Sequence, residues 1–131
     1  MLKQTSELKQ TVMRCSTFLS CCCPIFHYHR YIFPAIGLAA ASVKALRITD
    51  DDMLVAARTL AAQVKPERLA VGCLYPPLDD IRQVSANIAA AVAANIYSRG
   101  DANLSPRPDD LLKHCQSMMW DPKDNQSASK L

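Results

Sequence analysis

The clearest helical pattern in the chain lies at about residues 80–99. Apolar side chains recur there at steps of three and four residues: Ile81, Val84, Ile88, Ala91, Val92 and Ile96. This spacing places them on one face of an α-helix, and Gly100 follows as the residue type that ends helices in the left-handed conformation. Asp79 is the expected N-cap. Asn87 and Asn95 lie beside the apolar face, where each is expected to hydrogen-bond a neighbouring helix.

A second helix is predicted to begin after Thr49, which has the N-cap chemistry, with Asp52 three residues later as in a capping box. The three aspartates at residues 50–52 suit the positive end of a helix dipole, so we interpret them as helix-start residues rather than a cation site. The predicted apolar face comprises Met53, Ala56, Ala57, Leu60, Ala61 and Val64. Pro66 ends this helix or begins a short one, which Gly72 stops.

Two further helices are marked by prolines. Pro34 suits the first turn of a helix that continues to about Leu46, and Pro108 suits the first turn of one that ends before Trp120. Between the middle helices, the Tyr-Pro-Pro run at residues 75–77 predicts an extended linker. Because strand patterns are almost absent, the predicted fold class is mainly α, with about four helices.

Composition limits the function classes. The chain has 131 residues, enough for one small domain, and its net charge of +3 comes with no dense Lys/Arg cluster of the kind that nucleic-acid binding needs. No apolar run reaches the roughly 18 residues of a membrane span. The six cysteines are not spaced as a disulfide framework, which favours a reducing compartment. Glycine-rich nucleotide-binding, P-loop, serine-hydrolase and zinc-protease motifs are absent.

Residues 1–30 differ in character from the rest, and three interpretations stay open for them. The first is an alternative start, such as an unusual first exon or a retained intron. The second is a mitochondrial presequence, suggested by Lys3, Lys9 and Arg14 with few acids. The third is a zinc or copper site, for which the candidate ligands are Cys21, Cys22, Cys23, His27 and His29. The adjacent cysteines lack the usual spacing of a structural zinc site, which weighs against the third.

Four short stretches, taken in order, carry a family resemblance. They read Tyr-Ile-Phe-Pro-Ala-Ile-Gly-Leu at residues 31–38, Arg-Ile-Thr-Asp at 47–50, Tyr-Pro-Pro-Leu-Asp-Asp-Ile-Arg-Gln-Val at 75–84 and Ser-Met-Met-Trp-Asp-Pro at 117–122. The set resembles the C-terminal part of the NAD(P)-binding domain of malic enzymes. The resemblance implies three regions: a divergent, disordered segment at residues 1–30, the family segment at 31–122 and a disordered tail at 123–131.

Malic enzymes convert malate to pyruvate and CO₂ by oxidative decarboxylation, reducing NAD or NADP with the help of Mg²⁺ or Mn²⁺. In the family, the catalytic tyrosine and lysine, the metal-binding acids and the glycine-rich cofactor turn all lie upstream of the stretch that this chain matches. The resemblance therefore implies helices of a Rossmann-like domain with the sheet largely absent. It implies no catalytic, cofactor-binding or metal-binding residue in this chain.

One difference from the family is local. Members carry a Gly-Gln-Gly-Asn-Asn run, whose asparagines contact the substrate, just before the tyrosine that Tyr31 matches. This chain has Phe-His-Tyr-His-Arg at residues 26–30 instead, and Ala35 replaces a usual glycine. No substrate-binding role is therefore transferred, and Tyr28 is not proposed to supply one.

These observations favour a malic enzyme C-terminal fragment that is inactive alone. The alternatives are a non-catalytic helical module that associates with a full-length malic enzyme subunit or with copies of itself, and an unrelated small metal binder. The family implies a cytoplasmic or mitochondrial location, whereas the final Ser129-Lys130-Leu131 matches a peroxisomal address.

Overall fold

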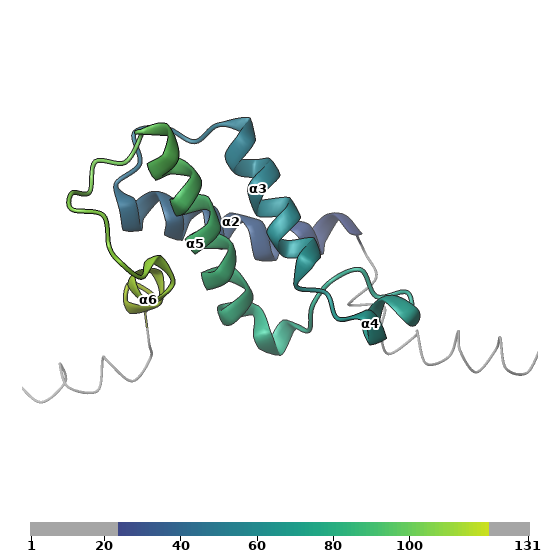
Figure 1. Cartoon of the computed structure of the whole chain (residues 1–131). Coiled ribbons are helices and arrows are strands. Elements are labelled where there is room, and N and C mark those ends of the chain that lie inside the picture. Colours follow the sequence, from purple (N-terminus) through teal and green to yellow (C-terminus); the bar gives the residue numbers. More distant parts are fainter. Residues whose placement is uncertain (1–23, 121–131) are drawn as a thin grey trace, which may run out of the picture.

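The computed structural model describes residues 24–120, and the side chains of residues 29–120 (Figure 1). The helices in this range are α2 (Pro24–Val43), α3 (Asp50–Ala62), α4 (Pro66–Ala70), α5 (Ile81–Arg99) and α6 (Leu111–Ser117), with a short 3₁₀ turn, η1 (Leu78–Asp80), before α5. Among the described residues the only β-type pairing is an isolated antiparallel bridge between Ala45 and Ala102. The prediction of a mainly helical chain is confirmed.

Helix α5 is the centre of the bundle and packs against α2, α3 and α6 (Figure 1). Its predicted apolar face is largely confirmed, since Ile88, Val92 and Ile96 are fully buried. The core also contains buried alanines from α2 and α5, namely Ala35, Ala39, Ala89 and Ala93. Because these side chains are small, the two helices can approach closely without leaving voids.

Helix α2 starts earlier than the sequence predicted. It begins at Pro24, so that Pro34 lies inside the helix instead of in its first turn. Pro34 has no N–H to donate to the carbonyl of Arg30, which weakens the helix at this point. The helix continues because residues on both sides of the proline are buried, with Tyr31 and Ile32 before it and Ala35 after it. Tertiary packing therefore overrides the local signal.

The sequence predicted some of the helix ends correctly and others wrongly. Gly100 ends α5 with a φ of 79°, as predicted. Asp79 is not the N-cap of α5, because η1 intervenes and the Asp80 N–H donates to the Pro77 carbonyl at 3.2 Å. Helix α6 begins at Leu111 and not near Pro108, since Asp110 supplies the cap by accepting from the Lys113 N–H at 3.0 Å.

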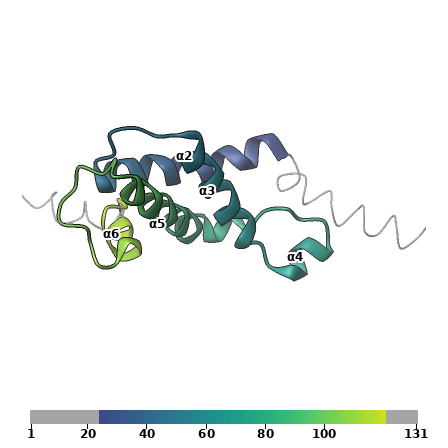
Figure 2. The ribbon, with the colours of Figure 1, turned by 45° about the horizontal axis from the view of Figure 1, so that its top comes forward.

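Two loops at one end of the bundle are joined by backbone hydrogen bonds. The N–H of Leu46 donates to the Asp101 carbonyl at 2.9 Å, and the N–H of Asn103 donates to the Lys44 carbonyl at 3.2 Å. At the other end, α4 lies away from the bundle (Figure 2). Its boundaries agree with the prediction, since it begins at Pro66 and is followed by Gly72 with a φ of 78°.

Candidate functional site

The strongest cluster of charged side chains is centred on Asp52, in the first turn of α3. The Asp52 carboxylate is fully buried and accepts two parallel hydrogen bonds from the Arg99 guanidinium, at 2.8 and 2.9 Å. It also accepts from the Thr49 N–H at 2.9 Å, the Thr49 hydroxyl at 3.1 Å and the Asn95 amide at 2.8 Å. These bonds join the start of α3 to the end of α5, which are far apart in the sequence.

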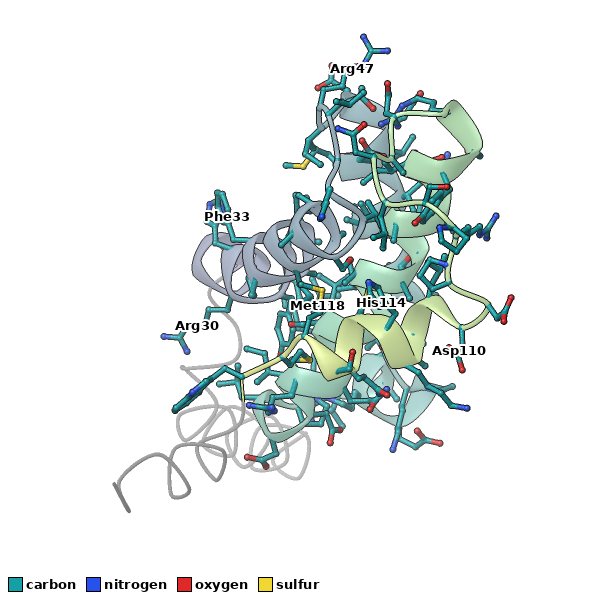
Figure 3. All side chains as sticks on the ribbon, turned by 90° about the vertical axis from the view of Figure 1, so that its left-hand side faces the viewer. Arg30, Phe33, Arg47, Asp110, His114 and Met118 are labelled. Atoms are coloured by element: carbon teal, nitrogen blue, oxygen red, sulfur yellow. The ribbon has the colours of Figure 1, made fainter. Side chains whose placement is uncertain are left out.

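Asp101 extends this cluster toward the surface. Its carboxylate accepts from Arg99 Nε at 2.8 Å and from Arg47 Nε at 3.1 Å, so that Arg99 bridges two carboxylates. Arg47 lies at the edge of the molecule and is 70% exposed (Figure 3). We call Arg47, Asp52, Arg99 and Asp101 the ionic network. A planar guanidinium suits such bidentate pairing.

The protonation states of the ionic network follow from its geometry. Burial by itself would raise the pKa of Asp52, but the hydrogen bonds, with Arg99 foremost, lower that pKa from 3.8 to about 2. Arg99 and then Arg47 lower the pKa of Asp101, and the hydrogen bond to Asp52 is the main reason that the pKa of Arg99 is raised. Asp52, Arg99 and Asp101 therefore stay charged near neutral pH, and the network is suited to holding helices together rather than to proton transfer.

The structure confirms several predictions for these residues. Thr49 and Asp52 form the predicted capping box, while Asp50 and Asp51 stay exposed. Asn95 hydrogen-bonds Asp52 of α3, and Asn87 donates to the side chain of Gln63, just after α3, at 2.7 Å. The pairing of Arg99 with Asp52 and Asp101 was not predicted. Its only sequence signal is a basic residue in the last turn of the central helix.

A second cluster joins two of the stretches that carry the family resemblance. The Tyr31 side chain is fully buried, and its hydroxyl donates to the Pro76 carbonyl at 2.8 Å. Its ring lies parallel to the Tyr75 ring, with the centroids 6.3 Å apart. The extended Tyr75-Pro76-Pro77 linker is thereby attached to α2.

The third cluster lies where α6 meets α2. His114 Nε2 is 2.9 Å from the Ser42 carbonyl oxygen, and the Cys115 thiol is 3.5 Å from the Ser42 hydroxyl. Burial raises the pKa of Cys115, so its reactive thiolate form is disfavoured. Figure 3 shows His114 on the bundle side of α6 and Met118 near its end. Beyond α6, an open groove of about 400 Å³ is lined by Pro34, Leu38, Ile81, Arg82, Ser85, Met118, Met119 and Trp120.

The structure brings together no group of potential metal ligands within its described part: no three His, Cys, Asp or Glu side chains gather there. His29 lies against the ring of Phe33, with the centroids 5.1 Å apart. Cys21, Cys22, Cys23 and the His27 side chain lie outside the described residues, as does the Ser129-Lys130-Leu131 end. The proposed metal site and peroxisomal address therefore stay predictions.

Comparison with known proteins connects this bundle to one family. Residues 28–97, which contain most of α2 and α5 and everything between them, match the model of the family described as "Malic enzyme, NAD binding domain". The chain belongs to the malic enzyme family. The resemblance seen in the four short stretches is thus confirmed.

Individual malic enzymes agree with the family match. The chain is 50% identical over 92 residues to the NADP-dependent malic enzyme of Populus trichocarpa and 49% identical over 92 residues to NADP-dependent malic enzyme 2 of Arabidopsis thaliana. It is 43% identical over 93 residues to the chloroplastic NADP-dependent malic enzyme of Flaveria pringlei. Each match covers 70–71% of this chain but 14–16% of the relative, so the chain spans about a sixth of the length of the malic enzymes it matches.

The described residues do not fit a dinucleotide. In open α/β domains the dinucleotide lies in a crevice at the ends of parallel strands, and residues 24–120 contribute no strand beyond the Ala45–Ala102 bridge. They also offer no grouped ligands for a divalent ion. No helix in the described part of the chain is both long and apolar enough to cross a membrane.

Proposed function

We propose that this chain forms the C-terminal helical part of a malic enzyme NAD(P)-binding domain. The reaction of the complete enzyme would be the oxidative decarboxylation of malate to pyruvate and CO₂ with NAD or NADP and a divalent ion. The observation that carries this proposal is the family match itself, which covers the helices at the centre of the bundle. Residues 28–97 include α3 and most of α2 and α5, the helices that share the buried core.

We propose further that the chain alone does not turn over malate. The reaction requires a base for the substrate hydroxyl, an acceptor for the hydride, a cation to polarise the developing carbonyl and an acid to protonate the enol. The polar side chains at the centre of the three clusters already make contacts within the bundle. Tyr31 donates to Pro76, Asp52 is paired with Arg99, and His114 lies against the Ser42 carbonyl. No buried side-chain N or O atom among the described residues lacks a hydrogen-bond partner.

The test is a malate-dependent assay of the purified chain. The chain is incubated with malate, Mg²⁺ or Mn²⁺ and either NAD or NADP, and formation of the reduced dinucleotide is followed by absorbance. The Populus trichocarpa NADP-dependent malic enzyme, assayed in the same buffer, shows that the conditions support turnover. We expect no rate above the blank for the chain alone. A rate that increases in proportion to the chain concentration would refute the proposed inactivity.

A second candidate function is favoured by the exposed apolar residues. Met118 and Trp120, which are 46% and 62% exposed, line one open groove together with Pro34 and Leu38. Large exposed apolar side chains that lie side by side are typical of surfaces that contact another protein. We propose, as the alternative, that the chain associates with a full-length malic enzyme subunit or with a second copy of itself.

Size-exclusion chromatography and co-purification test this alternative. The tagged chain is mixed with an untagged malic enzyme subunit at micromolar concentration, and a tagged unrelated helical protein serves as the control. Co-elution that requires the chain supports association. A monomeric chain that retains no subunit would exclude association at that concentration.

A further inference from the structure

Helix α4 lacks the packing that normally holds a short helix, and we call residues 65–74, which contain it, the α4 arm. Helix α4 has five residues, none of them buried, and it packs against no other described helix. A helix this short is not stable by itself in water. Three large apolar residues of the arm are also exposed, namely Leu69 at 50%, Val71 at 72% and Leu74 at 63%. Contacts outside α4 must therefore hold the arm in place.

The contacts that hold the arm lead to Tyr31. The N–H of Cys73 donates to the Arg68 carbonyl at 2.9 Å, and Arg68 Nε donates to the Tyr75 carbonyl at 3.1 Å. Tyr75 stacks on Tyr31, whose hydroxyl donates to the adjacent Pro76 carbonyl. Among the contacts of the described residues, Tyr75 and Pro76 thus connect the arm to the buried Tyr31 side chain of α2.

The part of α2 that carries Tyr31 is itself only partly secured to the rest of the helix. Pro34 cannot donate to the carbonyl of Arg30, so the helical hydrogen-bond ladder is interrupted between residues 30 and 34. The segment before Pro34 therefore depends on the burial of Tyr31 and Ile32. Prolines lie near both ends of the arm, with Pro66 as its second residue and Pro76 two residues after its end.

We propose that Tyr31, Tyr75 and Pro76 form a clasp that keeps the α4 arm and the segment of α2 before Pro34 closed as one unit. When the clasp opens, both segments separate from the bundle together and the Cys73 thiol, which is 3% exposed in the closed form, becomes accessible. The core around α5 loses Tyr31 and Ile32 on opening but keeps Ala35, Ala39 and Val43 of α2, which lie beyond Pro34 in the same buried cluster as Ile88, Val92 and Ile96. Weakly packed parts of a protein commonly open locally, and this opening costs less free energy than global unfolding.

This inference concerns the conformation of the chain and does not depend on whether the chain belongs to an active malic enzyme.

Thiol labelling under native conditions tests the clasp. Tyr31→Phe keeps the buried ring but removes the hydroxyl and leaves the buried Pro76 carbonyl without this donor. The matched control is Tyr97→Phe, which removes a hydroxyl that donates to the Leu104 carbonyl at 2.9 Å, away from the arm. Cys115, which is 0% exposed in the core, serves as the internal reference. Labelled peptides are quantified separately by mass spectrometry.

We expect Tyr31→Phe to label Cys73 about 5- to 30-fold faster than the unmodified chain, from the usual effect of leaving one buried acceptor unpaired. Labelling of Cys115 should not change, and Tyr97→Phe should leave Cys73 unaffected. The clasp is refuted if Tyr31→Phe leaves Cys73 labelling unchanged, or accelerates Cys73 and Cys115 equally, because equal acceleration indicates global unfolding.

A second measurement needs no variant and applies even if Tyr31→Phe does not fold. Native-state hydrogen exchange of the unmodified chain should give one common opening free energy for residues 29–33 and 66–74, lower than that of residues 88–96. Different opening free energies for the first two segments would overturn the proposal. Neither measurement involves malate or a dinucleotide, so its outcome is separate from that of the turnover assay.

Discussion

Replacing Asp52 by asparagine would remove the negative charge at the centre of the ionic network while keeping the size of the side chain. The Arg99 guanidinium would lose its bidentate partner, and the Thr49 N–H would lose a charged acceptor. The asparagine amide would also present N–H donors to groups that are donors themselves. We therefore expect the contact between the start of α3 and the end of α5 to weaken.

Two independent estimates give the size of the effect. Removing one partner of a buried ion pair costs about 3–5 kcal/mol, and the lower end applies here because Arg99 remains 23% exposed and keeps Asp101. The pKa of Asp52 is lowered from 3.8 to about 2, which corresponds to about 2 kcal/mol of preference for the charged form in the folded state. We expect Asp52→Asn to lower the free energy of unfolding by about 2–3 kcal/mol at neutral pH.

The sign of the pH dependence follows from the lowered pKa. Because the pKa of Asp52 is lower in the folded chain than in the unfolded chain, the carboxylate contributes its full stability above pH 3.8 and loses it as the pH falls through about 2. Between about pH 5 and pH 2, the unmodified chain should therefore lose about 2 kcal/mol more stability than Asp52→Asn. Comparing the two chains cancels the contribution of the other carboxylates.

Urea denaturation followed by far-UV circular dichroism measures both effects, since the bundle is mainly helical. Asp51→Asn is the matched control, because Asp51 lies in the same first turn but is exposed. Its loss should be no more than about 1 kcal/mol, from the helix dipole alone. The Asp52–Arg99 pair would not have this role if Asp52→Asn cost no more than Asp51→Asn, or if the stability of Asp52→Asn varied with pH in parallel with that of the unmodified chain.

Three core and backbone substitutions extend the same urea measurement. Ile88→Ala removes a fully buried side chain of α5 and should cost about 2–5 kcal/mol; a loss below 1 kcal/mol would contradict the central position of α5. Gly37→Ala should add about 0.5–1 kcal/mol, because a Cβ there meets nothing within 4 Å. Gly100→Ala should instead cost about 1–2 kcal/mol, because the φ of Gly100 is 79° although the space around it is equally open. Equal effects of the two glycine substitutions would contradict the backbone explanation.

The features that could be predicted from the sequence are those that short-range patterns determine. Helix α5 was predicted nearly in full, because its apolar period and its terminal Gly100 are contained within one segment. Thr49 and Asp52 were recognised as a helix start for the same reason. The expectation that Asn87 and Asn95 contact a neighbouring helix was correct, because polar side chains beside an apolar face need partners as the face is buried.

The features that could not be predicted depend on contacts between distant segments. Pro34 is a local signal for a helix start, yet α2 extends ten residues further toward the N-terminus because Tyr31 and Ile32 are buried. The start of α6 was misplaced because Pro108 and Asp110 both have helix-start chemistry, and only the bond from Lys113 to Asp110 distinguishes them. Likewise, Arg99 is recognisable as a basic residue near a helix end, but no local rule selects Asp52 as its partner.

The ionic network crosses the end of the matched family segment. The family match ends at residue 97, so it contains Asp52 and Asn95 but excludes Arg99 and Asp101. A bundle that ended at residue 97 would bury the Asp52 carboxylate without the guanidinium that contributes most to keeping it ionised. It would also lose the Asp101 carbonyl that accepts from Leu46. Because loss of the partner of a buried charge is destabilising, we expect a chain that ends at residue 97 to be less stable than one that includes Arg99 and Asp101.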